Sequence, residues 1–188
     1  QIGANLEAVA ERDAAEGPHQ LRVGLRRLRS AFDLFDETIG GAEAARLGAE
    51  ARWLGQEVGR LRDLDVALGD LVLPEARALP EEPGFAPLEA ALAAAAEAER
   101  ARLRATLAQA RAKAFLLDLT EFVATRGWLD PGDWGQTARL ARPLPALAAE
   151  ALDRRFAKAA KKAKVSAGLD IEARHDLRKA LKKLRYGV

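Results

Sequence analysis

The stretch His19-Gln-Leu-Arg-Val-Gly-Leu-Arg-Arg-Leu-Arg29 recurs near the other end of the chain as His175-Asp-Leu-Arg-Lys-Ala-Leu-Lys-Lys-Leu-Arg185. Six of the eleven positions are identical, and two more exchange arginine for lysine. Two copies of one supersecondary unit are the simplest explanation of such a repeat. The repeat therefore predicts a chain made of two related halves, which we place at 1–80 and 85–188.

Both copies have the periodicity of a helix with an apolar line and a basic line side by side. At about 100° per residue, the apolar residues of each copy fall within one narrow stripe, and the histidine and three cations run along its flank. The apolar lines are Leu21, Leu25, Leu28 and Phe32 in the first copy, and Leu177, Leu181 and Leu184 in the second. The basic lines are His19, Arg22, Arg26 and Arg29, and His175, Arg178, Lys182 and Arg185. Arg27 lies off the first basic line.

A charged line on a helix is most often a solvated face, but these lines are unusual for that role. Residues 18–30 contain four arginines and no acid, and like charges one turn apart destabilise a helix. Both copies have this repulsion between like charges, and in both a histidine lies on the same line. We therefore infer that a bound anion compensates the repulsion. The preceding helix adds Arg154, Lys158 and Lys161 on one line, with Arg155 and Lys162 beside it. Such a surface would bind a linear polyanion mainly by releasing its counterions.

The net charge of +2 over 188 residues conceals an uneven distribution. Residues 150–188 hold 12 Lys and Arg against 5 Asp and Glu, whereas 1–149 hold 18 against 23. The chain is thus an acidic body with two basic blocks, which points to a specific anionic partner.

The composition and the positions of glycine and proline predict an all-α fold. Aromatic residues are only 5% of the chain, and Ala, Leu, Arg and Glu dominate. We expect helices at 3–16, 18–38, 42–72, 86–126, 145–165 and 171–187. The Pro-rich stretch 74–87 is the expected connection between the halves. Asp170 is the expected N-cap of the last helix, and Trp128 and Trp134 are expected to pin the loop 127–135 to the body.

Several function classes are disfavoured. The chain has no cysteine and two histidines, so we expect no metal site and no cofactor. Neither histidine has a carboxylate on its line to orient it as a base, and no phosphate-binding Gly-x-x-x-x-Gly-Lys loop is present, so we do not expect an enzyme. Without a long apolar run or a signal peptide, we expect a soluble cytoplasmic protein without a membrane partner.

Three motifs in order resemble the signatures of the CHAD family, the conserved histidine alpha-helical domain. The His19–Arg29 helix resembles the family's opening motif, and His175–Tyr186 resembles the motif of its second half. Between them, Leu61-Arg62-Asp63-Leu64-Asp65-Val66 is similar to the family's Arg-Asp-Leu-Asp-Val element. The resemblance spans nearly the whole chain, so we expect one CHAD-like domain over 1–188. A Leu-Gly-x-Leu-x-Asp helix follows the second histidine motif in the family, and its absence before Val188 predicts a shortened second half.

The resemblance implies two pseudo-symmetric antiparallel helical bundles around a central basic groove or pore. It also implies that the ligand is inorganic polyphosphate, bound without catalysis in a role of targeting to, or organising, polyphosphate granules. The implied phosphate-facing residues are His19, Arg22, Arg26, Arg29, His175, Arg178, Lys182 and Arg185, with Lys158, Lys161 and Lys162 as a second tier and Arg62 ranked below them.

The central motif is more readily explained by a structural role. Asp63 and Asp65 are about 200° apart on a helix, so they cannot grip one metal or form an acid and base pair. We expect Asp63 to orient a neighbouring cation and Arg62 to be either paired or phosphate-facing.

A nucleic-acid-binding helical protein is the alternative, because the same basic lines would contact a sugar-phosphate backbone. Against it, the basic helices have almost no aromatic residues for base stacking, and Gln20 is the lone amide side chain for base edges.

Overall fold

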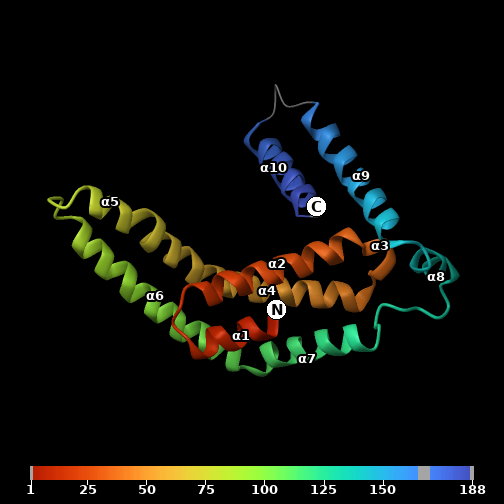
Figure 1. Cartoon of the computed structure of the whole chain (residues 1–188), viewed down its shortest axis with the longest axis horizontal. Helices are drawn as coiled ribbons and strands as arrows, with labels where there is room; N and C mark the ends of the chain where they lie inside the picture. Colours follow the sequence, from red (N-terminus) through yellow and green to blue (C-terminus); the bar gives the residue numbers. More distant parts are fainter. Residues whose placement is uncertain (1, 165–169, 187–188) are drawn as a thin grey trace. The chain divides into compact units, whose positions relative to one another are not determined.

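The computed structural model of the chain describes residues 2–164 and 170–186, which form helices and loops without a strand (Figure 1). The fold is all-α, as the composition predicts. By its contacts the chain divides into two compact units, each discontinuous in sequence. Unit 1 comprises Gln1–Arg26 and Ala49–Thr120, and unit 2 comprises Arg27–Gly48 and Glu121–Val188. The halves 1–80 and 85–188 rest on the sequence repeat, and they and their pseudo-symmetry stay a prediction.

Unit 1 contains helices joined mostly by short turns. They are α1 (Ile2–Glu11), the first part of α2 (Glu16–Leu34), most of α4 (Ala42–Val66), the π-helix η1 (Ala67–Val72), α5 (Leu73–Ala78), α6 (Phe85–Ala108) and most of α7 (Ala110–Ala124). The first half of the apolar line of the first basic helix lies in this core, because Leu21 and Leu25 are fully buried. They are buried together with Leu54, Val58, Leu61, Leu103 and Phe115. Burying each leucine contributes about 2 kcal/mol to the free energy of unfolding.

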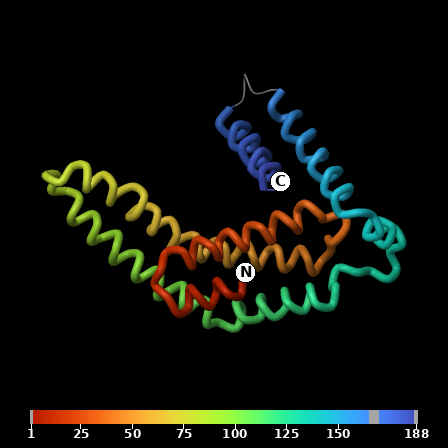
Figure 2. The backbone as a smooth tube through the Cα atoms, in the orientation of Figure 1, coloured from red at the N-terminus to blue at the C-terminus, as the bar shows by residue number. Residues whose placement is uncertain are grey.

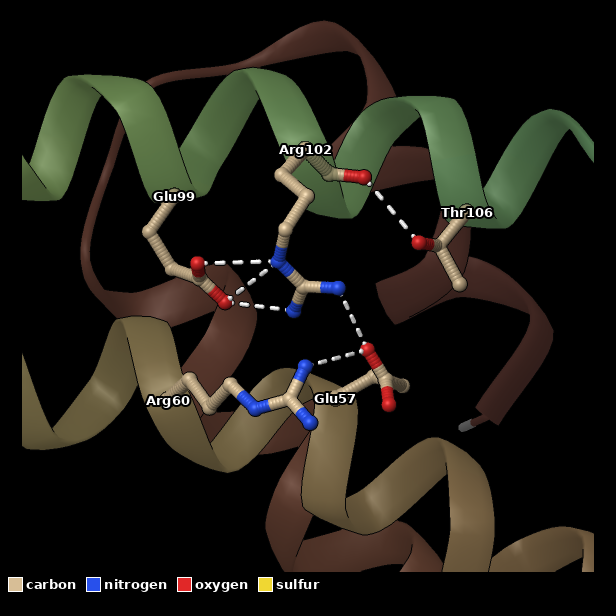
Figure 3. Close-up of polar contacts among 5 residues, drawn as sticks. All are labelled: Glu57, Arg60, Glu99, Arg102 and Thr106. Atoms are coloured by element: carbon tan, nitrogen blue, oxygen red, sulfur yellow. Dashed lines mark hydrogen bonds and ion pairs between the residues drawn. The ribbon is translucent and has the colours of Figure 1, made fainter.

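A polar network joins α4 to α6 within unit 1 (Figure 3). Arg102 on α6 donates hydrogen bonds to Glu99, one turn earlier, at 3.0 Å and to Glu57 on α4 at 2.6 Å. Arg60 donates to the same Glu57 carboxylate at 2.9 Å. The hydrogen bonds from Arg102 lower the pKa of the Glu99 carboxyl, which favours its ionised form.

The helix expected at 42–72 is regular only to Val66. It continues as the π-helix η1 and then as α5, which lies beside α6 in Figure 2. Pro74 is the second residue of α5, two residues after the end of η1, and in an α-helix its ring would clash with the carbonyl of Asp70. The wider turn of η1 accommodates the proline, which is why the helix reaches Ala78, inside the stretch expected to be a connection.

The single helix expected at 86–126 is wrong, because α6 and α7 meet at Gln109 in an extended conformation (φ −68°, ψ 152°). At the other end of the chain, the first two helices are shorter than expected. α1 stops at Glu11, and Gly17 and Pro18 lie in the first turn of α2, where proline needs no hydrogen-bond partner.

Among the described residues, unit 2 holds the ends of three helices shared with unit 1 and four helices of its own. Besides the ends of α2, α4 and α7, it contains α3 (Asp36–Ile39), α8 (Trp134–Leu140), α9 (Leu144–Ala163) and α10 (Ile171–Arg185). The last two agree with expectation, and Asp170 caps α10 by accepting a hydrogen bond from the Ala173 amide at 2.8 Å. The sequence predictions did not include α8.

An aromatic and amide cluster holds the loop before α8. The Trp128 ring packs 5.5 Å from Phe122, whose ring lies 5.8 Å from Phe32. Buried Gln136 donates to the carbonyls of Trp128 and Thr38 at 2.7 and 3.1 Å. Trp128 therefore pins the loop as predicted. The same prediction for Trp134 is wrong, because Trp134 is 82% exposed.

One largely buried arginine, Arg155, joins α9 to both α2 and α10 within unit 2. Arg155 donates to the Asp33 carboxylate at 2.9 Å and to the backbone carbonyl of Lys183 at 3.0 Å. The Lys183 ammonium also lies 3.3 Å from Asp33. Asp33 thus ties the packed pair α9 and α10 (Figure 2) to the last turn of α2.

None of the helices within 2–164 and 170–186 has a stretch long and apolar enough to cross a lipid bilayer.

Candidate anion-binding residues

The second basic line lies on α10, and the charged residues of this helix lie on two opposite sides of it. Within the repeat His175–Arg185, the predicted line lies about 80–160° from Leu177 on one side of the helix, at about 100° per residue. The other charged residues of the repeat lie about 100–160° from Leu177 on the opposite side. The predicted line is His175, Arg178, Lys182 and Arg185, and the opposite side holds Asp176, Lys179 and Lys183.

The cations on one side of α10 form ion pairs, and two cations on the other side do not. On the second side, Lys179 lies 3.3 Å from Asp176, and Lys183 pairs with Asp33. On the first side, Arg178 and Lys182 are exposed and form no ion pair with any residue of 2–164 or 170–186. The Arg185 guanidinium lies 5.9 Å from the Tyr186 ring and is also exposed. The predicted line therefore presents uncompensated positive charge.

The apolar line of the second copy is less buried than that of the first. Leu177 and Leu184 are half-buried, and Leu181 is 50% exposed. Leu181 lies between the packed face of α10 and the basic line. The two copies thus share a pattern but not a degree of burial.

The cations of α9 divide in a similar way. Lys158 and Lys161 are exposed and unpaired among the described residues. Arg154 pairs with Glu37 at 3.0 Å, and Arg155 holds Asp33. Lys162, the third predicted residue of this helix, lies 3.4 Å from Asp176, where hydrogen bonds from Lys179 and Lys162 lower the pKa of the carboxyl.

The first basic line starts in unit 1 on α2. His19, Arg22 and Arg26 are half-buried there, on the flank of the buried leucines. Arg22 donates a hydrogen bond from Nη1 to Asp63 on α4 at 2.9 Å. Asp63 therefore contacts a neighbouring cation, as predicted, and its orienting role stays a prediction. Arg29, the last residue of the line, is half-buried and belongs to unit 2.

The central motif places its two aspartates in different environments, as their angular separation predicts. Asp63 is exposed, whereas the side chain of Asp65 is only 9% exposed and lies 3.7 Å from Arg100, which is 8% exposed. Burial raises the pKa of Asp65, and the charges of Arg100 and Arg62 act against this increase. Arg62 lies 3.8 Å from Asp70, so it is paired.

The buried pair of Asp65 with Arg100 was not among the sequence predictions. Arg100 lies in a helix rich in alanine and surface charge, and its spacing from Glu97 suggests only a local surface pair. Both partners contribute to packing between α4 and α6, and neither lies on a basic line.

The predicted residues are therefore divided between the units. Unit 1 holds His19, Arg22, Arg26 and Arg62, and unit 2 holds Arg29, Lys158, Lys161, Lys162, His175, Arg178, Lys182 and Arg185. The convergence of the two lines on one groove or pore stays a prediction. Within the described residues, no group of three or more His, Cys, Asp or Glu side chains is arranged to hold a metal ion.

Comparison with known proteins identifies the family. The family model of the CHAD domain matches residues 1–188. A comparison of the sequence with curated proteins finds no significant match. Among solved structures, the chain is similar to the crystal structure of the CHAD domain from the plant Ricinus communis, with a TM-score of 0.75 and 30% sequence identity. That similarity covers 99% of this chain and 58% of the plant chain. From the match along its whole length, the chain belongs to the CHAD domain family.

Proposed function

We propose that the chain binds inorganic polyphosphate without turning it over, and that this binding targets it to polyphosphate granules or organises them. The observation that carries the proposal is the division of charge on α10. Cations on one side of the helix are neutralised by Asp33 and Asp176, whereas Arg178 and Lys182 on the other side have no ion-pair partner among the described residues.

Uncompensated cations in a line suit a flexible linear polyanion. From His175 to Arg185 the line is about 15 Å long, at 1.5 Å of rise per residue. A longer polyanion would contact more of the line and release more counterions than a short one, so affinity should rise with chain length and fall steeply with salt. Arginine forks bind phosphate oxygens in pairs, and lysines add point charge.

The histidine at the start of each line adds a dependence on pH. A bound phosphate chain stabilises the charged form of a nearby imidazole. We expect polyphosphate to bind more tightly at mildly acidic pH. Replacing His19 and His175 with glutamine should reduce that increase, whereas an unchanged pH profile would remove the histidines from the proposed site.

Two neighbouring residues provide the sharpest test. Arg178→Ala removes an unpaired cation, and Lys179→Ala removes a cation of the same helix that is paired with Asp176. Titrations with polyphosphates of graded length at several salt concentrations should give Arg178→Ala a salt slope that is smaller by about 0.7–0.9. Lys179→Ala should keep the slope of the unmodified chain. If the two variants lost the same amount of polyphosphate affinity, net charge alone would determine binding.

Two further measurements separate the alternatives. RNA at equal phosphate concentration should compete weakly with polyphosphate, and equal competition would favour a nucleic-acid ligand. Incubation of polyphosphate with the chain and Mg²⁺ should release no phosphate. Turnover that is lost in a variant of His19 or His175 would replace the binding role with a catalytic one.

A further inference from the structure

Arg22 differs from the unpaired cations of α10 because an acid holds it within the basic line. Its Nη1 donates to Asp63 at 2.9 Å. The two residues come from different motifs, one on α2 and the other on α4, and both belong to unit 1. An acid beside a line of cations reduces the local positive charge, so its presence there needs an explanation.

The guanidinium is also supported by the backbone of α4. Gly59 precedes Asp63 by one turn, and a Cβ at Gly59 would lie 3.4 Å from Nη1 and 3.8 Å from Cζ of Arg22. Arg22 therefore rests on a position without a side chain and is fixed at its end by Asp63. These distances are ordinary van der Waals contacts, so the guanidinium lies close against α4 at this position.

This arrangement holds Arg22 without using all of its donors. One Nη1 contact engages Asp63, and the Arg22 side chain remains 43% exposed. Within 2–164 and 170–186, no other polar contact engages the guanidinium. A bidentate carboxylate would occupy the fork that phosphate oxygens need, whereas a single contact leaves donors for a ligand.

We propose that Asp63 is a positioning residue that fixes the Arg22 guanidinium for phosphate, so that this acid strengthens the binding of a polyanion. The inference rests on the proposed function. An arginine on a flexible stem loses rotamer freedom when it binds, and a side chain already held by Asp63 and Gly59 has less freedom to lose.

The sign of one substitution tests this inference. If only long-range charge matters, Asp63→Asn removes a negative charge and strengthens polyphosphate binding. If Asp63 positions Arg22, the same substitution weakens binding by about three- to tenfold. Glu75→Gln is the matched control, because Glu75 is an exposed acid of unit 1 that forms no ion pair with the described residues. It should bind as tightly as the unmodified chain or slightly more tightly.

The effect should also depend on Arg22. In an Arg22→Gln background, Asp63→Asn should no longer weaken binding, because the residue to be positioned is absent. Asp63→Glu should recover part of the affinity by restoring a carboxylate. Urea unfolding of each variant checks that the fold is retained.

The outcomes separate the two proposals. If the unmodified chain does not bind polyphosphate, the proposed function fails. If it binds, and Asp63→Asn binds at least as tightly as Glu75→Gln, the positioning role is wrong while the proposed function stands. A loss of affinity that persists in the Arg22→Gln background also overturns the positioning role.

Discussion

Two adjacent arginines of α9 offer a direct test of the packing of unit 2. Arg155 is 13% exposed and bridges Asp33 on α2 to the backbone of α10, whereas Arg154 is 51% exposed and pairs with exposed Glu37. We replace each arginine in turn with methionine, which keeps much of the apolar stem and removes the charge and the donors. Both variants lose one ion pair, so they differ mainly in burial.

The structure sets the expected magnitudes. Arg155→Met loses a hydrogen bond to a carboxylate, worth about 1.5–3 kcal/mol, and one to a carbonyl, worth about 1 kcal/mol. Lys183 still pairs with Asp33 after the substitution, which limits the loss to about 2–4 kcal/mol. Arg154→Met loses an exposed ion pair and should cost about 0–1 kcal/mol.

Urea unfolding measures the difference. Trp53 lies in unit 1 and the other two tryptophans in unit 2, so a Trp53→Phe background makes fluorescence report on unit 2. With a urea dependence of about 1–3 kcal/mol per molar, Arg155→Met should unfold at roughly 1 M lower urea than Arg154→Met. Circular dichroism of the same samples follows the loss of helix.

Equal midpoints for the two variants would refute the reasoning, because burial would then make no difference. A double-mutant cycle with Asp33→Asn provides a second check. Arg155 and Asp33 should be coupled by about 1–3 kcal/mol, and additive losses would show that the contact does not join α9 to α2.

Four further predictions concern Asp65, Gln136 and the two tryptophans of unit 2. Asp65→Ala should cost about 1–3 kcal/mol in urea unfolding, because it removes a carboxylate beside the buried Arg100, which then keeps only its contacts with Glu97 and Asp13 among the described residues. Burial raises the pKa of Asp65, so the folded chain binds the Asp65 proton more tightly than the unfolded chain does. The free energy of unfolding should therefore fall as pH rises from 3.8, the ordinary pKa, through the raised pKa. Urea unfolding at graded pH should show this dependence in the unmodified chain and not in Asp65→Asn. Gln136→Ala should cost about 2 kcal/mol in urea unfolding, since it leaves two carbonyls and the Asp130 amide without their side-chain partner, and a loss under about 0.5 kcal/mol would contradict this. Trp128→Ala should lower the melting temperature while Trp134→Ala leaves it nearly unchanged, and the reverse order would contradict the packing described here.

Local sequence patterns predicted the helices well where packing and pattern agree. The basic helices α2 and α10 were recognisable from their periodicity, and Asp170 from its position before an apolar and charged run. The break at Gln109 could not be predicted this way, because no glycine or proline marks it. The short helix α8 was also missed, although its N-cap Asp133 is a recognisable signal in retrospect.

The chemical types of the candidate residues were predictable, but most of their partners were not. Asp33 and Arg155 are far apart in sequence, and nothing local links them. The pairing of Arg22 with Asp63 was anticipated only as an acid next to some cation. Which cations remain unpaired depends on such distant contacts, so the division of charge on α10 could be found only from the structure.

That division gives α10 an electric moment across its axis, in addition to the moment along it. A polyanion approaching the helix would be turned toward the unpaired side before any contact forms, so fewer encounters would be unproductive. This orientation changes the association rate, which should fall as salt screens the field of the helix. The dissociation rate should depend mainly on the contacts made after docking. Kinetic measurements would then show Arg178→Ala changing both rates and Lys179→Ala, whose charge is paired with Asp176, changing neither rate appreciably.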